Sequence, residues 1–179
     1  MIIRLITLNV DGLHTKITTG FFQDFISKTG ADVYCLQETR TSSSTIEMMK
    51  PAGYSVAVSE SNNKRYGGCV TYIKEDPLAT RRNSLQFMEH EGRFILLEYP
   101  GYYLLNIYLP NAGANKQRLD KKIESLEWLI RLSKLLDEKK PVIMCGDFNV
   151  AAYLYLSSEK VTTDLNEKPA ISEKERSVL

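Results

Sequence analysis

The alternation of strand-like and helix-like segments in the first forty residues is the feature that most constrains this chain. Residues 2–9 combine apolar and β-branched side chains in the manner of a buried strand. Residues 20–29 place their aromatic and aliphatic side chains on one helical face, and Gly30 follows as a glycine does just past a helix end. Residues 32–37 form a second apolar run, which we expect to pair in parallel with the first. This order predicts an α/β fold.

The rest of the pattern is richer in strands. Ser44–Glu47 fits a capping box that opens a short helix, and Pro51 would end it. Further strands are expected at 54–59, 67–74, 93–99, 102–109 and 141–149, with a hairpin at Pro100-Gly101 and a long helix at 115–138. Beyond Ala151 the pattern weakens, and a last helix is expected near Ser172. No repeat or linker divides the chain, so we expect one domain over residues 1–179.

Composition restricts the class of protein but not its substrate. The net charge is +1, so nucleic-acid binding would need a local patch of charge. No apolar run approaches the roughly 20 residues that span a bilayer. Cys35, Cys69 and Cys145 lie in or beside strand-like runs, without cysteine or histidine neighbours at metal-ligand spacing. We therefore expect buried free thiols in a reducing compartment, the cytoplasm or, in a eukaryote, the nucleus.

Four expected strands end in polar side chains that apolar packing does not explain. These side chains are Asn9 and Asp11, Glu38, Tyr108 and Asn111, and Asp147 and Asn149. If the strands share one sheet, their ends converge on one cleft, where α/β sheets bind ligands. A single aspartate or asparagine at a strand end is ordinarily a turn or cap residue, and a strand tyrosine ordinarily packs. The interpretation rests on four such ends in one chain.

The residue types at these ends favour metal-assisted phosphodiester hydrolysis. Asp11, Glu38 and Asp147 offer hard oxygen ligands, which favour magnesium, or alternatively manganese, over zinc. Asn9 and Asn149 can orient a water or a phosphate oxygen without adding charge repulsion. Neither His14 nor His90 is a candidate ligand, since each is isolated in the sequence.

Six motifs together resemble the exonuclease III and apurinic/apyrimidinic endonuclease family, within the endonuclease–exonuclease–phosphatase superfamily. They are LNVDGLH, LQET, GGCVTYIK, EGRFILLEY, IYLPNAG and CGDFNVA, and the resemblance runs from residue 2 to about residue 151. It implies a layered α/β/β/α sandwich of the DNase I type. It also implies a magnesium-dependent DNA phosphodiesterase of base-excision repair, which cuts 5′ to abasic sites and trims 3′ ends.

The resemblance also implies a role for each candidate. Glu38 resembles the principal metal ligand, with Asn9 and Asp11 assisting it. Tyr108 and Asn111 resemble residues that contact the scissile phosphate. Asp147 resembles the residue that activates or positions the attacking water, and Asn149 one that holds Asp147 or the phosphate.

The chain departs from the family pattern in its later part. No Ser-Asp-His motif is present, and AAYLYLS follows GDFNVA where relatives carry acidic residues. We therefore expect a C-terminally truncated member with an incomplete second sheet, weak or inactive by itself, whose exposed sheet is covered by self-association or a partner. Two alternatives stay open. One is a retrotransposon-type endonuclease or another phosphodiesterase of the superfamily, and the other is a non-catalytic DNA-binding or interaction module.

Overall fold

The computed structural model describes residues 2–112 and 115–150 of the 179-residue chain. The expected loop after Ala151 and helix near Ser172 lie outside the described residues. The chain divides into two compact units, Met1–Tyr108 with Leu132–Asp147, and Leu109–Arg131 with Phe148–Leu179. Each unit is considered by itself below, and the single domain stays a prediction.

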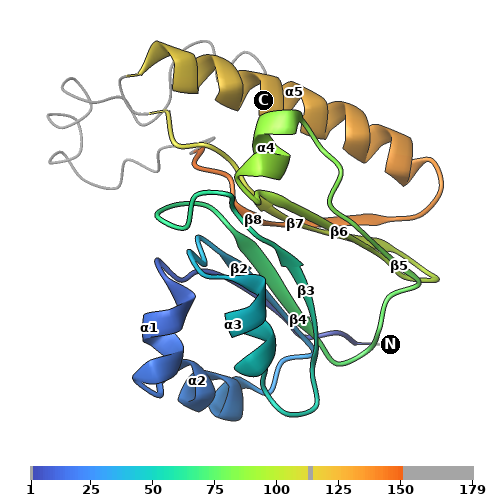
Figure 1. Cartoon of the computed structure of the whole chain (residues 1–179). Coiled ribbons are helices and arrows are strands. Elements are labelled where there is room, and N and C mark those ends of the chain that lie inside the picture. Colours follow the sequence, from blue (N-terminus) through green and yellow to red (C-terminus); the bar gives the residue numbers. More distant parts are fainter. Residues whose placement is uncertain (1, 113–114, 151–179) are drawn as a thin grey trace, which may run out of the picture. The chain divides into compact units, whose positions relative to one another are not determined.

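The first sheet of the larger unit has four strands in the order β1-β2-β4-β3. These are β1 (Leu5–Asn9), β2 (Val33–Gln37), β3 (Ser55–Ser59) and β4 (Cys69–Ile73). β1 and β2 are parallel, as predicted, and β4 is antiparallel to both of its neighbours. Three helices, α1 (Leu13–Thr18), α2 (Phe21–Thr29) and α3 (Ser43–Met48), pack their buried side chains against this sheet (Figure 1).

The second sheet also has four strands among the described residues, in the order β5-β6-β7-β8. These are β5 (Ala79–Arg81), β6 (Phe94–Glu98), β7 (Tyr103–Tyr108) and β8 (Val142–Asp147), and a short helix, α4 (Gln86–His90), lies between β5 and β6 in the sequence. β6 and β7 form the predicted hairpin at Pro100-Gly101. The long helix α5 (Lys116–Asp137) connects β7 to β8, which pair in parallel.

The two sheets share a core, so the larger unit is a mixed α/β structure with two facing sheets. Val33, Cys35 and Cys69 of the first sheet lie in one apolar cluster with Ile95 and Leu104 of the second. This confirms the expected layered α/β class. The incompleteness of the second sheet stays a prediction.

One polar network crosses this apolar core. The Gln37 side chain donates to Asn106 Oδ1 at 2.7 Å, and Asn106 Nδ2 donates to Thr71 Oγ1 at 3.1 Å and to the Val70 carbonyl at 3.0 Å. Gln37 and Asn106 are each only 1% exposed. Because a buried amide without partners is costly, this network favours one register between the sheets.

Three short elements and one cap differ from the expectation. α1, β5 and α4 were not predicted, because three to six residues are too few to establish a hydrophobic period. The cap of α3 is Ser42 rather than Ser44, and its hydroxyl accepts from the Thr45 amide at 3.3 Å. The capping-box prediction was therefore wrong by two residues.

Two expectations from composition can be compared with the structure. Cys35, Cys69 and Cys145 are buried free thiols, as predicted. Within the described residues, no helix is both long enough and apolar enough to cross a membrane.

Candidate active site

Four of the predicted site residues lie at one end of the larger unit. Asn9 ends β1, Glu38 directly follows β2, Tyr108 ends β7 and Asp147 ends β8. The convergence is as predicted, but the assumption that the strands share one sheet is wrong. β1 and β2 belong to the first sheet and β7 and β8 to the second, so the site is formed where parallel strand pairs of two facing sheets end together.

Asn9 connects the acidic residues of the two sheets. Its Nδ2 donates to Glu38 Oε2 at 2.9 Å and to Asp147 Oδ2 at 2.8 Å. One amide group thus uses its two protons to hold two carboxylates close together, which a third carboxylate at this position could not do.

Arg40, which sequence reasoning missed, connects Glu38 with Asp11. Its guanidinium forms ion pairs with Glu38 and, at 2.7 Å, with Asp11 Oδ1. Burial acts to raise the pKa of Glu38, but hydrogen bonds from Asn9 and Arg40 outweigh it, so the pKa lies below its ordinary value. Glu38 is therefore ionised at neutral pH. The same pair raises the pKa of Arg40.

The backbone beneath these side chains is left-handed at three positions. Asp11, Glu38 and Arg40 have φ values of 43°, 58° and 49°, which residues other than glycine and asparagine seldom adopt. The segment after β2 is held by Gly67 and Gly68, whose carbonyls accept from the Arg40 and Thr39 amides. Strained backbone of this kind concentrates at functional sites and needs surrounding structure to maintain it.

Tyr108 is fixed by Arg93, a second residue that sequence reasoning missed. The Arg93 guanidinium carbon lies 4.4 Å from the centre of the Tyr108 ring, and Nη1 donates to the Tyr108 carbonyl at 3.1 Å. Nε of Arg93 donates to Glu91 Oε2 at 2.5 Å. Burial and the negative charge of Glu38 raise the pKa of Tyr108 to about 12, and Arg93 works against this rise. The phenol therefore stays protonated, and in the structure it interacts with Glu38, whose pKa it helps to lower.

Both arginines lie in or directly beside motifs that the sequence analysis identified. Arg40 directly follows LQET, and Arg93 is the only charged side chain between Gly92 and Glu98. An arginine at the start of an apolar strand is a signal for a buried partner, because a guanidinium is rarely buried without one. The pairing of β6 with β7 brings Tyr108 to Arg93, and the residue types around Arg93 do not reveal this partner.

Asn111 and Asn149 belong to the smaller unit. Asn149 has a left-handed φ of 50°, its Nδ2 donates to the Leu109 carbonyl at 2.9 Å, and its own carbonyl accepts from Lys122 Nζ at 2.5 Å. This last bond accounts for a lysine that is 2% exposed. The roles of Asn111 and Asn149 at a phosphate stay predictions.

The oxygen-rich side chains fit a hard divalent ion that keeps part of its water shell. In the described part of the chain, no three acidic, histidine or cysteine residues form a group that could hold a metal ion alone. Magnesium does not need such a group, since it is commonly bound by one or two carboxylates, water and substrate phosphate. The ionised Glu38, with Asp147 held beside it through Asn9, meets that requirement.

Known proteins resemble this chain in sequence over most of its length. The model of the Endonuclease/Exonuclease/phosphatase family matches residues 6–159. The chain is 33% identical over 149 residues to an exodeoxyribonuclease of Bacillus subtilis, covering 83% of this chain and 59% of the relative. It is 37% identical over 154 residues to a DNA-(apurinic or apyrimidinic site) endonuclease of Dictyostelium discoideum, of which it covers 42%.

The fold is similar to solved structures of this group. The 3′-5′ exonuclease NExo from Neisseria meningitidis has a TM-score of 0.76 at 20% identity, over 97% of this chain and 68% of that one. The chain spans about half the length of the curated relatives that it matches.

Proposed function

Because the chain belongs to the endonuclease/exonuclease/phosphatase family, we propose that it hydrolyses phosphodiester bonds in DNA, 5′ to abasic sites and at 3′ ends. The observation that carries this proposal is the Asn9 amide, which holds the Glu38 and Asp147 carboxylates together where the strand ends of two sheets meet. The curated relatives, an exodeoxyribonuclease and an apurinic/apyrimidinic endonuclease, indicate the substrate class.

The family consists of divalent-metal-dependent enzymes, and we assign the metal to Glu38 with Asn9 and Asp11 assisting. Magnesium is the ion that this oxygen donor set favours, with manganese as the alternative. When bound, the ion supplies Lewis-acid polarisation of the phosphoryl oxygens and partial neutralisation of their charge. Arg40 already places a positive charge on the same carboxylates in the structure.

The remaining side chains have separate tasks around a phosphate. The Asp147 carboxylate accepts the proton of the attacking water, and the Asn9 amide holds that carboxylate in place. The Tyr108 hydroxyl, protonated at neutral pH, donates a hydrogen bond to a phosphate oxygen. Arg93 orients the Tyr108 ring without contacting the reacting atoms.

A substrate panel tests the proposal. The protein would be incubated in excess over end-labelled DNA, so that even slow cleavage is visible in one turnover, and Asp147→Asn would be its inactive counterpart. We expect slow, magnesium-dependent incision 5′ to a tetrahydrofuran lesion and slow removal of 3′-terminal nucleotides, because the chain spans only about half the length of its curated relatives. Equal cleavage of an intact duplex would favour a retrotransposon-type endonuclease. Saturable DNA binding by folded protein, without cleavage of any substrate, would contradict the proposal and leave a DNA-binding module.

We further propose that the second sheet is covered in the working protein by another chain or a second copy. β8 has a pairing partner on one side only among the described residues, and its Ile143 and Met144 are 41% and 43% exposed. Light scattering after gel filtration would show a dimer that Ile143→Lys disrupts. A monomer that stays soluble and folded at high concentration would argue against self-association. A reducing compartment is proposed on the basis of the three free thiols.

A further inference from the structure

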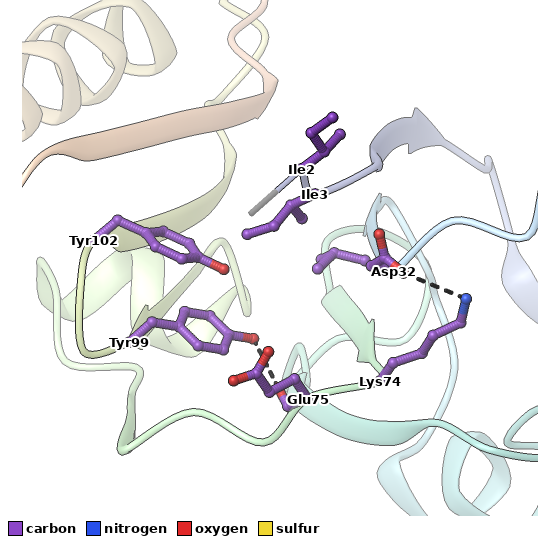
Figure 2. A pocket seen from close by; sticks show the side chains of 8 residues that line it. Ile2, Ile3, Asp32, Lys74, Glu75, Tyr99 and Tyr102 are labelled. Carbon is purple, nitrogen blue, oxygen red and sulfur yellow. Dashed lines mark hydrogen bonds and ion pairs between the residues drawn. The ribbon is translucent and has the colours of Figure 1, made fainter.

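A pocket lies at the end of the larger unit opposite the candidate active site. Its volume is about 240 Å³. Its walls come from the residues before β1, the start of β2, the end of β4 and the β6–β7 hairpin, whereas the active-site residues lie at the other ends of β1, β2 and β7. Figure 2 shows the side chains that surround it. The pocket shares no residue with the site described above.

Most of the charge around this pocket is already compensated. Asp32 Oδ2 accepts from the Arg4 amide at 2.9 Å, and Asp32 Oδ1 pairs with Lys74 Nζ at 3.4 Å. The same Lys74 ammonium also donates to the Gly30 carbonyl at 2.9 Å. Asp32 and Lys74 therefore form a neutral pair that is held by the backbone on both sides.

Two polar groups at the pocket are not part of this ion pair. Among the residues that the structure describes, neither the carboxylate of the exposed Glu75 nor the hydroxyl of the half-buried Tyr102 has a hydrogen-bond or ion-pair partner. The Tyr99 hydroxyl, by contrast, donates to the Glu75 carbonyl at 3.1 Å. Both tyrosine hydroxyls point to the side where Ile3 and Glu75 lie (Figure 2). Burial raises the pKa of Tyr102, and the negative charges of Glu75 and Asp32 raise it further.

The walls around these groups are apolar and partly rigid. The Tyr99 and Tyr102 rings stack with their centroids 4.7 Å apart and their planes 14° from parallel, and Tyr99 is 3% exposed. Ile2, Ile3 and Val33 supply the aliphatic part of the lining. The volume is below the about 300–1,000 Å³ of pockets for drug-sized ligands, so the occupant is the size of one long side chain.

We propose that this pocket binds an alkylammonium or guanidinium group carried on an apolar stem. The Glu75 carboxylate supplies the opposite charge, the Tyr102 hydroxyl accepts a hydrogen bond, and Ile3, Val33 and the Tyr102 ring cover the stem. An anion would be repelled by the exposed Glu75 carboxylate, and a neutral alkyl group would gain no attraction from it. The cation is either a free amine or a lysine or arginine side chain of a partner protein. The inference does not depend on the proposed nuclease function.

The test is a titration of the whole protein, followed by NMR signals of the Ile3 methyl groups and the Tyr99 and Tyr102 rings. The probes are n-butylammonium, amide-capped lysine, amide-capped arginine and, as a matched neutral control, amide-capped norleucine. We expect saturable shifts with the cations and none with norleucine. Glu75→Gln should weaken binding about threefold to fivefold, because the Glu75 carboxylate is exposed and water screens its ion pair. Tyr102→Phe keeps the stacked ring and should weaken binding less.

Matched controls separate the pocket from general charge attraction. Glu47→Gln removes an exposed carboxylate elsewhere in the same unit and should leave binding unchanged. Tighter binding of capped lysine or arginine than of n-butylammonium identifies a partner side chain as the source, and equal binding identifies a free amine. Absence of saturable shifts in the folded protein would overturn the proposal. Equal affinity for norleucine, or full affinity in Glu75→Gln, would overturn it as well.

Discussion

Asn9 Nδ2 lies 2.8 Å from Asp147 Oδ2, although the two residues are 138 positions apart and belong to different sheets. The same nitrogen donates to Glu38. A neutral amide between two carboxylates allows the strand ends of both sheets to approach. The contact that joins the two sheets at this end is therefore also the one on which the proposed metal site depends.

Asn9→Asp is predicted to destabilise the metal-free protein, because a third carboxylate would replace the donor between Glu38 and Asp147. We expect a loss of about 2–4 kcal/mol at neutral pH, which added magnesium should partly restore by neutralising the three charges. Thermal unfolding with and without magnesium measures this. Asn62→Asp, at an exposed position, is the control and should change little in either condition. Destabilisation that magnesium does not relieve would contradict the prediction.

Gly146→Ala is predicted to prevent the normal pairing of β7 and β8. Gly146 has φ of 140°, and a Cβ there would lie 1.9 Å from the Ile107 carbonyl oxygen, so the strand that carries Asp147 must move. We expect a loss above about 4 kcal/mol or failure to fold. Gly101→Ala in the hairpin is the control, since no atom lies within 4 Å of its Cβ position. Urea unfolding curves compare the two, and equal stabilities would refute the prediction.

Arg93→Met is predicted to destabilise the protein by about 3–5 kcal/mol, because it leaves the Glu91 carboxylate and the Tyr108 carbonyl without a donor. Arg93→Lys keeps the charge but loses the planar contact with the ring, so its stability should be intermediate. In Arg93→Lys the rate of cleavage should fall even under conditions where the protein stays fully folded, since Tyr108 loses its orientation. Urea unfolding and single-turnover cleavage test this, with the exposed Arg65→Met as control. Cleavage by Arg93→Lys at the wild-type rate would show that Arg93 does not position Tyr108.

Glu60 is predicted to contribute to stability at neutral pH and to lose that contribution in acid. Its Oε2 accepts from the Ser43 amide at 2.7 Å and from the Ser43 hydroxyl, at the start of α3, and these bonds lower the pKa of Glu60 to about 2. Because the folded-state pKa is below the unfolded value, the stabilisation is complete above the ordinary pKa of 4.5 and lost as pH falls towards 2.

Glu60→Gln should therefore cost about 2 kcal/mol at pH 7. The stability difference from wild type should shrink as the pH falls below the ordinary carboxyl range. Urea unfolding across this range measures both. A difference that does not change with pH would show that charge is not the cause.

Much of the site was predictable from strand ends alone. Polar residues such as Glu38 and Asp147 directly follow apolar runs, and a local pattern is enough to reveal them. The division into two sheets was not predictable by this argument, because the pairing of β7 with β8 and of β1 with β2 depends on contacts between distant segments. The motif resemblance supplied that part.

Arg40 and Arg93 show the limit of sequence reasoning from residue types. Arg40 looks like a solvated charge until its partners are known, whereas the position of Arg93 indicates a buried partner without identifying it. The partner of Arg93 is the ring of Tyr108, which lies on the neighbouring strand. The left-handed backbone at Glu38 was equally hidden, since glutamate carries no preference for that conformation.

The central claim is that Glu38 organises a divalent-metal site for phosphodiester cleavage. The most direct measurement compares wild type, Glu38→Gln and the exposed control Glu47→Gln in single-turnover cleavage of a duplex with one tetrahydrofuran lesion, at increasing magnesium and with EDTA. The account predicts magnesium-dependent incision by wild type and Glu47→Gln, and a loss of at least about a hundredfold in Glu38→Gln. Incision that persists in EDTA, or that Glu38→Gln carries out at the wild-type rate, would contradict it.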